Sequence, residues 1–196
     1  KGEEVTYASV KPDVTFESAV TNETAVTNET AVTNETAVTN ELEPHIKLSK
    51  KQEKVLLLCD QGHNIFMSGP GGTGKSFLIQ LIIKRYLHKQ IQVCALTGCA
   101  AELLGCNAKT VHSWSGTGVS RKSIDNIIMS ISCRKDCMKA WRKVDILIVD
   151  EVSMMSNRMF ELLNRLGQTI RMNKKPFGGI QLILSGDFFQ LPPVKE

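Results

Sequence analysis

One stretch of the chain has the residue types and the spacing of a phosphate-binding loop. The pattern GxxxxGK[ST] is matched at every fixed position by Gly69, Pro70, Gly71, Gly72, Thr73, Gly74, Lys75 and Ser76. In such a loop backbone N–H groups surround the phosphates, the lysine reaches the β- and γ-phosphates, and the serine hydroxyl ligates Mg²⁺. A plain glycine turn is the other interpretation. We favour the phosphate loop because an apolar strand pattern precedes it and a helical pattern follows it, which is the context that the motif requires.

A second candidate is the acidic pair Asp150-Glu151, which follows the apolar run Asp145–Val149. A buried strand that ends in an aspartate places the carboxylate at the ligand-binding edge of an α/β sheet. We therefore predict that Asp150 holds the metal and that Glu151 orients and deprotonates the attacking water, which is hydrolysis. A surface acidic pair with no such role is the alternative.

A third candidate is Gln190, in the sequence GDFFQLPP that follows the strand pattern Ile180–Ser185. An uncharged amide can both donate and accept hydrogen bonds, so Gln190 could sense the γ-phosphate or position the water. The other interpretation is a loop in which the two prolines simply stop the strand.

The elements that must position these residues alternate between strands and helices. Helical patterns are expected near residues 49–59, for about fourteen residues after the glycine loop, at 100–104 and at 157–172, with weak helices between 104 and Trp141. The helix after the glycine loop can place Phe77, Leu78, Leu81, Ile82 and Leu87 on one face. Strand patterns lie at 64–68, 91–96, 145–149 and 180–185. Because these strands are apolar on both faces, the predicted fold class is α/β, with a mostly parallel sheet between layers of helices.

Charge divides the chain at Pro44. Residues 1–44 hold two basic and nine acidic residues, a net charge of 2 − 9 = −7, so the remaining 22 Lys and Arg against 11 Asp and Glu give residues 45–196 a net charge of +11. Such a basic body predicts a polyanionic partner, first of all nucleic acid. Apolar runs fall far short of the roughly 20 residues that span a bilayer, and no signal-peptide pattern begins the chain, so we expect an intracellular protein.

The acidic segment contains a repeat, AVTNET, from Ala19 to Glu41. Its period fits neither a helix nor a buried strand, and its composition predicts a disordered tail over residues 1–44. A β-helix is a weaker alternative, because these repeats barely supply one coil. Glycosylation at the Asn-Glu-Thr sites is also weaker, because it requires a secretory route.

These three candidate segments, in this order, resemble those of superfamily-one DNA helicases. The resemblance narrows at Lys174–Leu184 (KKPFGGIQLIL) and the following GDFFQLPPV, which look like the PIF (petite integration frequency) helicase family over Leu48–Val194. It implies that residues 45–196 are an N-terminal RecA-like lobe using ATP and Mg²⁺. It further implies a monomeric helicase moving 5′ to 3′ on single-stranded DNA, opening duplex or structured DNA in replication, repair, recombination or telomere maintenance. A eukaryotic member would work in the nucleus or mitochondrion, and a second lobe with the remaining arginines is expected beyond Glu196.

The resemblance also assigns binding residues. Gln52 falls where the family has an adenine-reading glutamine, although Ser49 and Gln52 also form a capping-box pattern, and both can be true. Two further segments look like contacts to single-stranded DNA, and their candidate residues are Thr97, Gly98, His112, Ser113 and Trp114. Small residues at helix N-termini approach phosphates closely, and Trp114 either stacks on a base or packs in the core.

Two other classes of protein remain open from the residues alone. One is a P-loop kinase or another nucleotide-binding protein without a nucleic-acid substrate, and the other is a non-catalytic binding module. The acidic pair Asp150-Glu151, the charge of the body and the KPFGGIQLIL stretch argue against the first class. The sequence beyond Glu196 would decide on the second, because a true second lobe must supply arginines.

Overall fold

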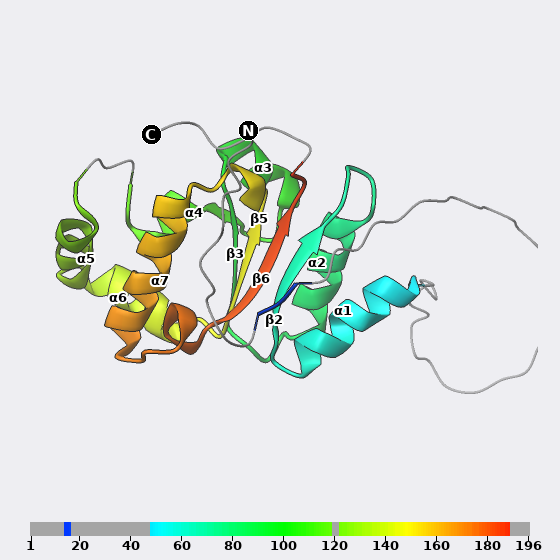
Figure 1. Ribbon diagram of the computed structural model, residues 1–196, viewed down its shortest axis with the longest axis horizontal. Helices are drawn as coiled ribbons and strands as arrows, with labels where there is room; N and C mark the ends of the chain where they lie inside the picture. The colour runs from blue at the N-terminus through cyan, green and yellow to red at the C-terminus, as the bar shows by residue number, and fades with distance from the viewer. Residues whose placement is uncertain (1–13, 17–47, 119–121, 189–196) are drawn as a thin grey trace, which may run out of the picture.

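A six-stranded parallel sheet forms the centre of the computed structural model, which describes residues 14–16, 48–118 and 122–188 (Figure 1). The strand order is β1-β2-β6-β5-β3-β4, and every neighbouring pair is parallel. The strands are β1 Val14–Phe16, β2 Asn64–Ser68, β3 Ile91–Ala95, β4 Lys109–Thr110, β5 Ile146–Asp150 and β6 Gln181–Gly186.

Helices cover both faces of the sheet. Helices α1 Lys50–Asp60, α2 Lys75–Arg85 and α3 Gly98–Leu104 pack on one face. The other face carries α4 Val111–Ser115, α5 Ile124–Ser132, α6 Lys135–Lys143 and α7 Asn157–Arg171, which lie on the opposite side of the sheet from α1 and α2 in Figure 1. Two short 3₁₀ helices complete the fold: η1 Val152–Met154 directly follows β5, and η2 Pro176–Gly179 directly precedes β6. The α/β prediction is confirmed.

The central strand β5 is buried along its whole length, which explains its continuous apolar sequence. Ile146 and Ile148 pack with the α1–α3 layer, whereas Leu147 and Val149 pack with the α4–α7 layer. Successive side chains of a strand point to opposite faces, so a strand between two helical layers is apolar at every position.

The strand register brings the carboxyl ends of the main strands to one edge of the sheet. Ala95 pairs with Asp150, Val149 with Leu184, and Ser68 with Gly186. The segments that follow β2, β3, β5 and β6 therefore emerge together, at the edge where open α/β sheets bind ligands.

The helix after the glycine loop is shorter than expected. It ends at Arg85, because Tyr86 leaves the helical region (φ −112°, ψ 39°), and Leu87 is 81% exposed rather than part of the buried face. The buried face consists of Leu78, Ile79 and Ile82, while Phe77 is 38% exposed.

A short strand in the N-terminal segment was not predicted. Val14–Phe16 pairs in parallel with β2, joining Val14 to Asn64 and Phe16 to Phe66. Its sequence, VTF, has the β-branched and aromatic residues that favour strands, and it precedes the repeat on which the prediction of disorder rested. The repeat itself lies outside the described residues. In the part of the chain that is described, no helix combines the length and apolar character needed to cross a membrane.

Candidate nucleotide-binding site

The glycine loop connects the buried strand β2 to helix α2. Gly72 (φ +77°) and Gly74 (φ +85°) adopt left-handed backbone conformations, which glycine reaches without the steric cost that a Cβ imposes. Gly74 is also the N-cap of α2 and has no side chain to satisfy the helix's first N–H groups. Those groups remain available to an anion at the positive end of the helix dipole.

Two side chains of the loop bond back to its own carbonyls. The Lys75 Nζ donates to Gly69 O at 2.6 Å and to Pro70 O at 3.0 Å. The Thr73 Oγ1 donates to the same Pro70 carbonyl at 2.9 Å. These bonds hold the Lys75 ammonium over the loop, while Ser76 is exposed in the first turn of α2.

The acidic pair lies at the same edge of the sheet. Asp150 is the last residue of β5 and is 7% exposed. Glu151 turns the chain from β5 into η1 in the left-handed region (φ 56°, ψ 36°), which is unfavourable for a residue with a Cβ. Strained backbone of this kind is concentrated at functional sites, where the surrounding structure maintains it.

The pKa of Glu151 responds to charged groups from the glycine loop and from two strand ends. Partial burial raises the pKa of Glu151 above its usual value, the charges of Asp150 and Asp187 raise it further, and the Lys75 ammonium lowers it. Asp187 is itself buried, at 5% exposed, directly after β6. Sequence reasoning gave no role to Asp187, although its place directly after a strand, like that of Asp150 at a strand end, was an available signal.

The ligands available to a metal are hard oxygen donors: the Ser76 hydroxyl and the Asp150 carboxylate. Such donors suit Mg²⁺, which keeps several waters and is bound through one or two protein groups and substrate phosphates. Within residues 14–16, 48–118 and 122–188, no group of three or more His, Cys, Asp or Glu side chains could hold a metal ion by itself.

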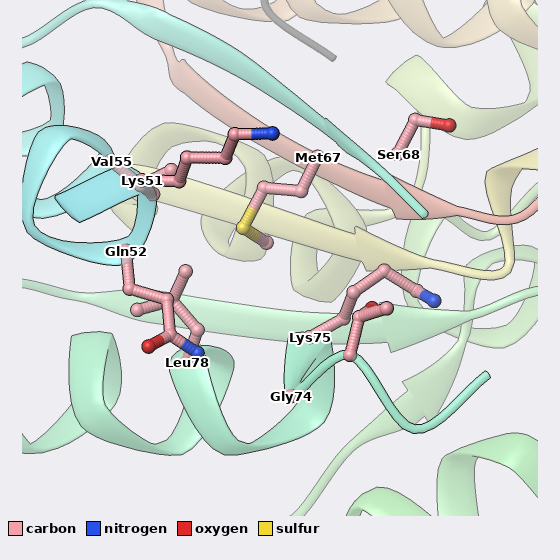
Figure 2. Close-up of a pocket in the computed structure, with 9 residues that line it drawn as sticks. Lys51, Gln52, Val55, Met67, Ser68, Gly74, Lys75 and Leu78 are labelled. Atoms are coloured by element: carbon pink, nitrogen blue, oxygen red, sulfur yellow. The ribbon is translucent and has the colours of Figure 1, made fainter. Parts of the chain in front are cut away.

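A pocket beside the loop is formed by α1, β2 and the start of α2 (Figure 2). Apolar side chains from all three elements line it, namely Val55, Met67 and Leu78. Gln52 and Lys75 also line it, and Figure 2 shows Gln52 extending from α1 toward α2 and Lys75 extending from the start of α2. The lining surface is mostly apolar, and its polar residues are Lys51, Gln52, Ser68, Thr73 and Lys75.

Gln52 has the capping-box geometry expected from the sequence. Its Oε1 accepts from Ser49 N at 3.0 Å, and its own N–H donates to Ser49 Oγ at 3.3 Å. Its Nε2 lies 3.0 Å from the position that a Cβ on Gly74 would occupy, so the amide also borders the glycine loop. The capping role is confirmed, and the adenine-reading role stays a prediction.

The two segments predicted to contact DNA lie side by side. Thr97 is the N-cap of α3 and Thr110 is the N-cap of α4, and their Oγ1 atoms accept from Ala100 N and Ser113 N, each at 3.2 Å. Ala95 of β3 pairs with Thr110 of β4 as well as with Asp150, so both helix N-termini lie at the edge of the acidic pair. Gly98 and Ser113 are exposed there, and His112 is half-buried.

The prediction that Trp114 contacts nucleic acid is wrong for this structure. The Trp114 ring is 6% exposed and packs against Trp141, with 4.6 Å between the ring centroids. In the single turn of α4, Val111 and Trp114 lie three residues apart and share the buried side, which directs the indole into the core. Gln190 lies outside the described residues, so its predicted role is untested.

Fold and site together define a P-loop nucleotide-binding domain with a RecA-like α/β fold. A glycine loop between a strand and a helix, with a strand-end carboxylate at the same edge of a parallel sheet, is the defining arrangement. The sequence model of the PIF1-like helicase family matches residues 47–196, and the chain belongs to that family. This result confirms the resemblance drawn from the KPFGGIQLIL and GDFFQLPPV sequences.

Individual relatives agree with this assignment. The ATP-dependent DNA helicase RRM3 of Saccharomyces cerevisiae is 43% identical over 156 residues, which are 77% of this chain and 21% of that protein. The crystal structure of the Pif1 helicase from Candida albicans is 41% identical, with a TM-score of 0.71 over 76% of this chain and 35% of that one. A Bacteroides Pif1 structure bound to single-stranded DNA is 28% identical, with a TM-score of 0.64 over 77% and 34%. The chain thus spans about a fifth of the RRM3 length and about a third of the solved helicases.

Proposed function

We propose that this chain is the ATP-binding part of a DNA helicase that couples ATP hydrolysis to 5′ to 3′ movement on single-stranded DNA and to duplex opening. The observation that carries the proposal is the convergence of Lys75, Asp150 and Glu151 with the N-termini of α3 and α4 at one sheet edge. Helicase relatives at about 40% identity, and a relative whose structure contains single-stranded DNA, support it. The division into a tail over 1–44 and a RecA-like lobe over 45–196 belongs to the same proposal.

The hydrolytic roles follow from the chemistry of each group. Lys75 neutralises charge on the β- and γ-phosphates, and the loop N–H groups bind the phosphate oxygens. Ser76 and Asp150 would hold Mg²⁺, and the ion would supply positive charge against the charge that develops during phosphoryl transfer. Glu151 takes the proton of the attacking water, because its raised pKa makes it a stronger base than an ordinary exposed carboxylate. Gln190 senses the γ-phosphate or orients that water.

The pocket beside the loop suits the base of the nucleotide. An adenine ring would pack against Val55, Met67 and Leu78, while the Gln52 amide at the rim can donate to and accept from the edge of the ring. The pocket borders Gly74 and Lys75, so one ligand can occupy both the pocket and the loop.

The proposed DNA contacts use helix N-termini and small side chains. Thr97, Gly98, His112 and Ser113 can approach a phosphate backbone, and the net charge of +11 on residues 45–196 favours a polyanion. Replication, repair, recombination and telomere maintenance are the processes in which we place the activity.

The test is ATP hydrolysis and strand separation by the complete gene product, with and without single-stranded DNA. We expect hydrolysis that rises with single-stranded DNA and is abolished by Lys75→Ala. Lys84→Ala is the matched control, because Lys84 is exposed at the far end of the same helix. ATP hydrolysis that ignores DNA would instead favour a nucleotide-dependent enzyme without a nucleic-acid substrate.

A further inference from the structure

Ser185 is a fully buried hydroxyl with no hydrogen-bond partner among the described residues. Its side chain is 0% exposed, and its Oγ is one of two buried side-chain oxygens left unpaired, the other being that of Ser153. An unpaired buried hydroxyl costs free energy, and such groups in folded proteins require an explanation. An apolar residue at this position would avoid the cost, so the hydroxyl has a use outside the packing.

The strand register places Ser185 beside Asp150. Val149 of β5 pairs with Leu184 of β6, so the next step along both strands brings Asp150 next to Ser185. On its other side Ser185 pairs with Met67 of β2, which is apolar. Of the residues flanking Ser185 on the neighbouring strands, Asp150 is therefore the one that can accept a hydrogen bond.

Both side chains point to the face of the sheet that carries the phosphate loop. Ile148 and Ile183 belong to the α1–α3 layer, and Asp150 and Ser185 each lie two residues further along the same strands. Because side chains alternate, residues two apart share a face. Helix α2 packs on this face through Leu78, Ile79 and Ile82, so the hydroxyl is on the same side of the sheet as α2.

We propose that Ser185 is a positioning residue whose hydroxyl donates to the Asp150 carboxylate when magnesium nucleotide binds. This inference rests on the proposed function. A neutral donor fixes one carboxylate oxygen and leaves the other directed at the metal, without adding a positive charge that would compete with Mg²⁺. Carboxylates that bind metals are commonly held by such hydrogen bonds, and removing the partner typically weakens metal affinity by about 10- to 100-fold.

The test measures how much Mg²⁺ this chain requires to bind a fluorescent ATP analogue. For Ser185→Ala we expect the half-saturating Mg²⁺ concentration to rise by about tenfold, with nucleotide affinity in EDTA unchanged. The melting temperature without nucleotide should stay the same or rise, because the variant removes an unpaired buried hydroxyl. Ser185→Cys, which keeps the shape with a weaker donor, should raise the Mg²⁺ requirement in the same direction.

Ser115→Ala is the control. Ser115 is also 0% exposed, but its hydroxyl is paired with Thr117 Oγ1 at 3.0 Å, so its loss should lower the melting temperature without changing the Mg²⁺ requirement. An unchanged Mg²⁺ requirement in Ser185→Ala and Ser185→Cys, beside a wild type that responds to Mg²⁺, would overturn the inference and leave the proposed function intact. A wild-type chain whose nucleotide binding ignores Mg²⁺ would overturn both.

Discussion

Lys75 and Glu151 interact electrostatically with each other at one edge of the sheet, yet the proposed mechanism uses them at different steps. Lys75 is held over the loop by carbonyl contacts, and in the proposed mechanism it binds the phosphates of the nucleotide. Glu151 follows the carboxyl end of β5 at the same edge of the sheet, on a residue with left-handed backbone, and it is not part of the loop. Binding and hydrolysis should therefore be separable by mutation.

We predict that Lys75→Ala weakens ATP binding, whereas Glu151→Gln preserves binding and blocks hydrolysis. The first variant removes a positive charge from the phosphates, and the second keeps the side-chain shape but removes the base, which contributes about 10²- to 10⁴-fold in rate. Equilibrium binding of a fluorescent ATP analogue and single-turnover hydrolysis measure the two effects. Equal losses of nucleotide affinity in both variants would refute this division of roles.

At the residue scale the sequence was most informative where a motif fixes both residue type and backbone. The phosphate loop, Asp150 and the Ser49–Gln52 capping box lie as predicted because local spacing determines them. Trp114 was not predictable in this way, because its burial depends on Trp141, which is distant in sequence. The same is true of Ser185, whose neighbour Asp150 is defined only by the sheet register.

At the scale of elements, the KKPFGGIQLIL stretch that carries the family resemblance connects helix α7 to strand β6. The sequence Pro176–Gly179 forms η2, which precedes β6 and so lies at the sheet edge opposite the nucleotide site. Arg171 of α7 donates to Gly178 O at 2.9 Å and to Trp141 O at 2.8 Å, joining α7, η2 and α6. This stretch therefore fixes where β6 begins, and β6 in turn carries Ser185 and Asp187 to the site.

Gly167→Ala should destabilise this junction. A Cβ on Gly167 would lie 2.5 Å from Phe177 O, and Phe177 is already in a left-handed conformation (φ 50°). Backbone cannot move aside as a flexible side chain can, so we expect a loss of about 1–3 kcal/mol in the free energy of unfolding. Urea denaturation measures it, with Glu161→Ala on the exposed side of α7 as the control, expected within about 0.5 kcal/mol of wild type. A neutral Gly167→Ala would show that α7 and η2 are not tightly joined.

A second junction ties the ends of α1 and α2 through Asp60. Arg85 Nε donates to Asp60 Oδ1 at 3.0 Å, and the Tyr86 hydroxyl donates to the same oxygen. The hydrogen bonds from Arg85 and then Tyr86 lower the pKa of Asp60 from its ordinary value of 3.8. The contribution of Asp60 to stability is therefore fully present above about pH 4 and is lost as the pH falls through the lowered pKa.

We expect Asp60→Asn to lower the melting temperature at pH 7, with the difference from wild type vanishing below the lowered pKa. Thermal melts across pH 2–7 measure this convergence, and Glu53→Gln in the exposed first turn of α1 controls for loss of a carboxylate. A difference that persists unchanged at the lowest pH would mean that Asp60 acts by packing and not by its charge.

Element types were largely predictable, and element ends less so. The strands β2, β3, β5 and β6 were expected within one residue, because their apolar runs are bounded by turn or charged residues. The end of α2 was missed, since the apolar pattern continues to Leu87 while the Asp60 contact engages Arg85 and Tyr86 where the helix stops. The pairing of β1 with β2 could not be predicted, because it joins segments separated by the whole repeat.

For the whole molecule, the charge division predicts strongly salt-dependent DNA binding. Each neutralised phosphate contributes about −0.7 to the slope of log K against log salt for single strands, so three contacts give a slope near −2. We expect residues 45–196 to show such a slope and to bind more tightly at low salt than the whole chain, because residues 1–44 add a net charge of −7. Fluorescence anisotropy of a labelled oligonucleotide measures both, and a flat salt dependence would exclude electrostatic binding.

The positions of the arginines predict how much of the reaction this chain can perform by itself. Rapid phosphoryl transfer in P-loop enzymes requires a positive group on the transferring phosphoryl, and an arginine in that position contributes about 10³- to 10⁵-fold in rate. The described arginines have partners elsewhere: Arg85 on Asp60, Arg134 on Gly116, Arg142 on Ile170, Arg158 on Lys122, Arg165 on Asp125 and Arg171 on Gly178. Of the described cations, Lys75 is the one seated on the loop.

We therefore predict that residues 1–196 bind magnesium ATP but hydrolyse it at a trace rate and separate no strands. Translocation requires parts that close and reopen around the nucleotide, and this chain spans about a fifth of its helicase relative RRM3. The measurement compares DNA-stimulated ATP hydrolysis by this chain with that of the complete gene product, using Glu151→Gln in each as the background. Robust stimulated turnover by residues 1–196 would contradict the prediction and show that a cation within these residues completes the site. That cation would be Arg121 or an arginine that leaves its present partner. Substituting each arginine with alanine in turn would identify it.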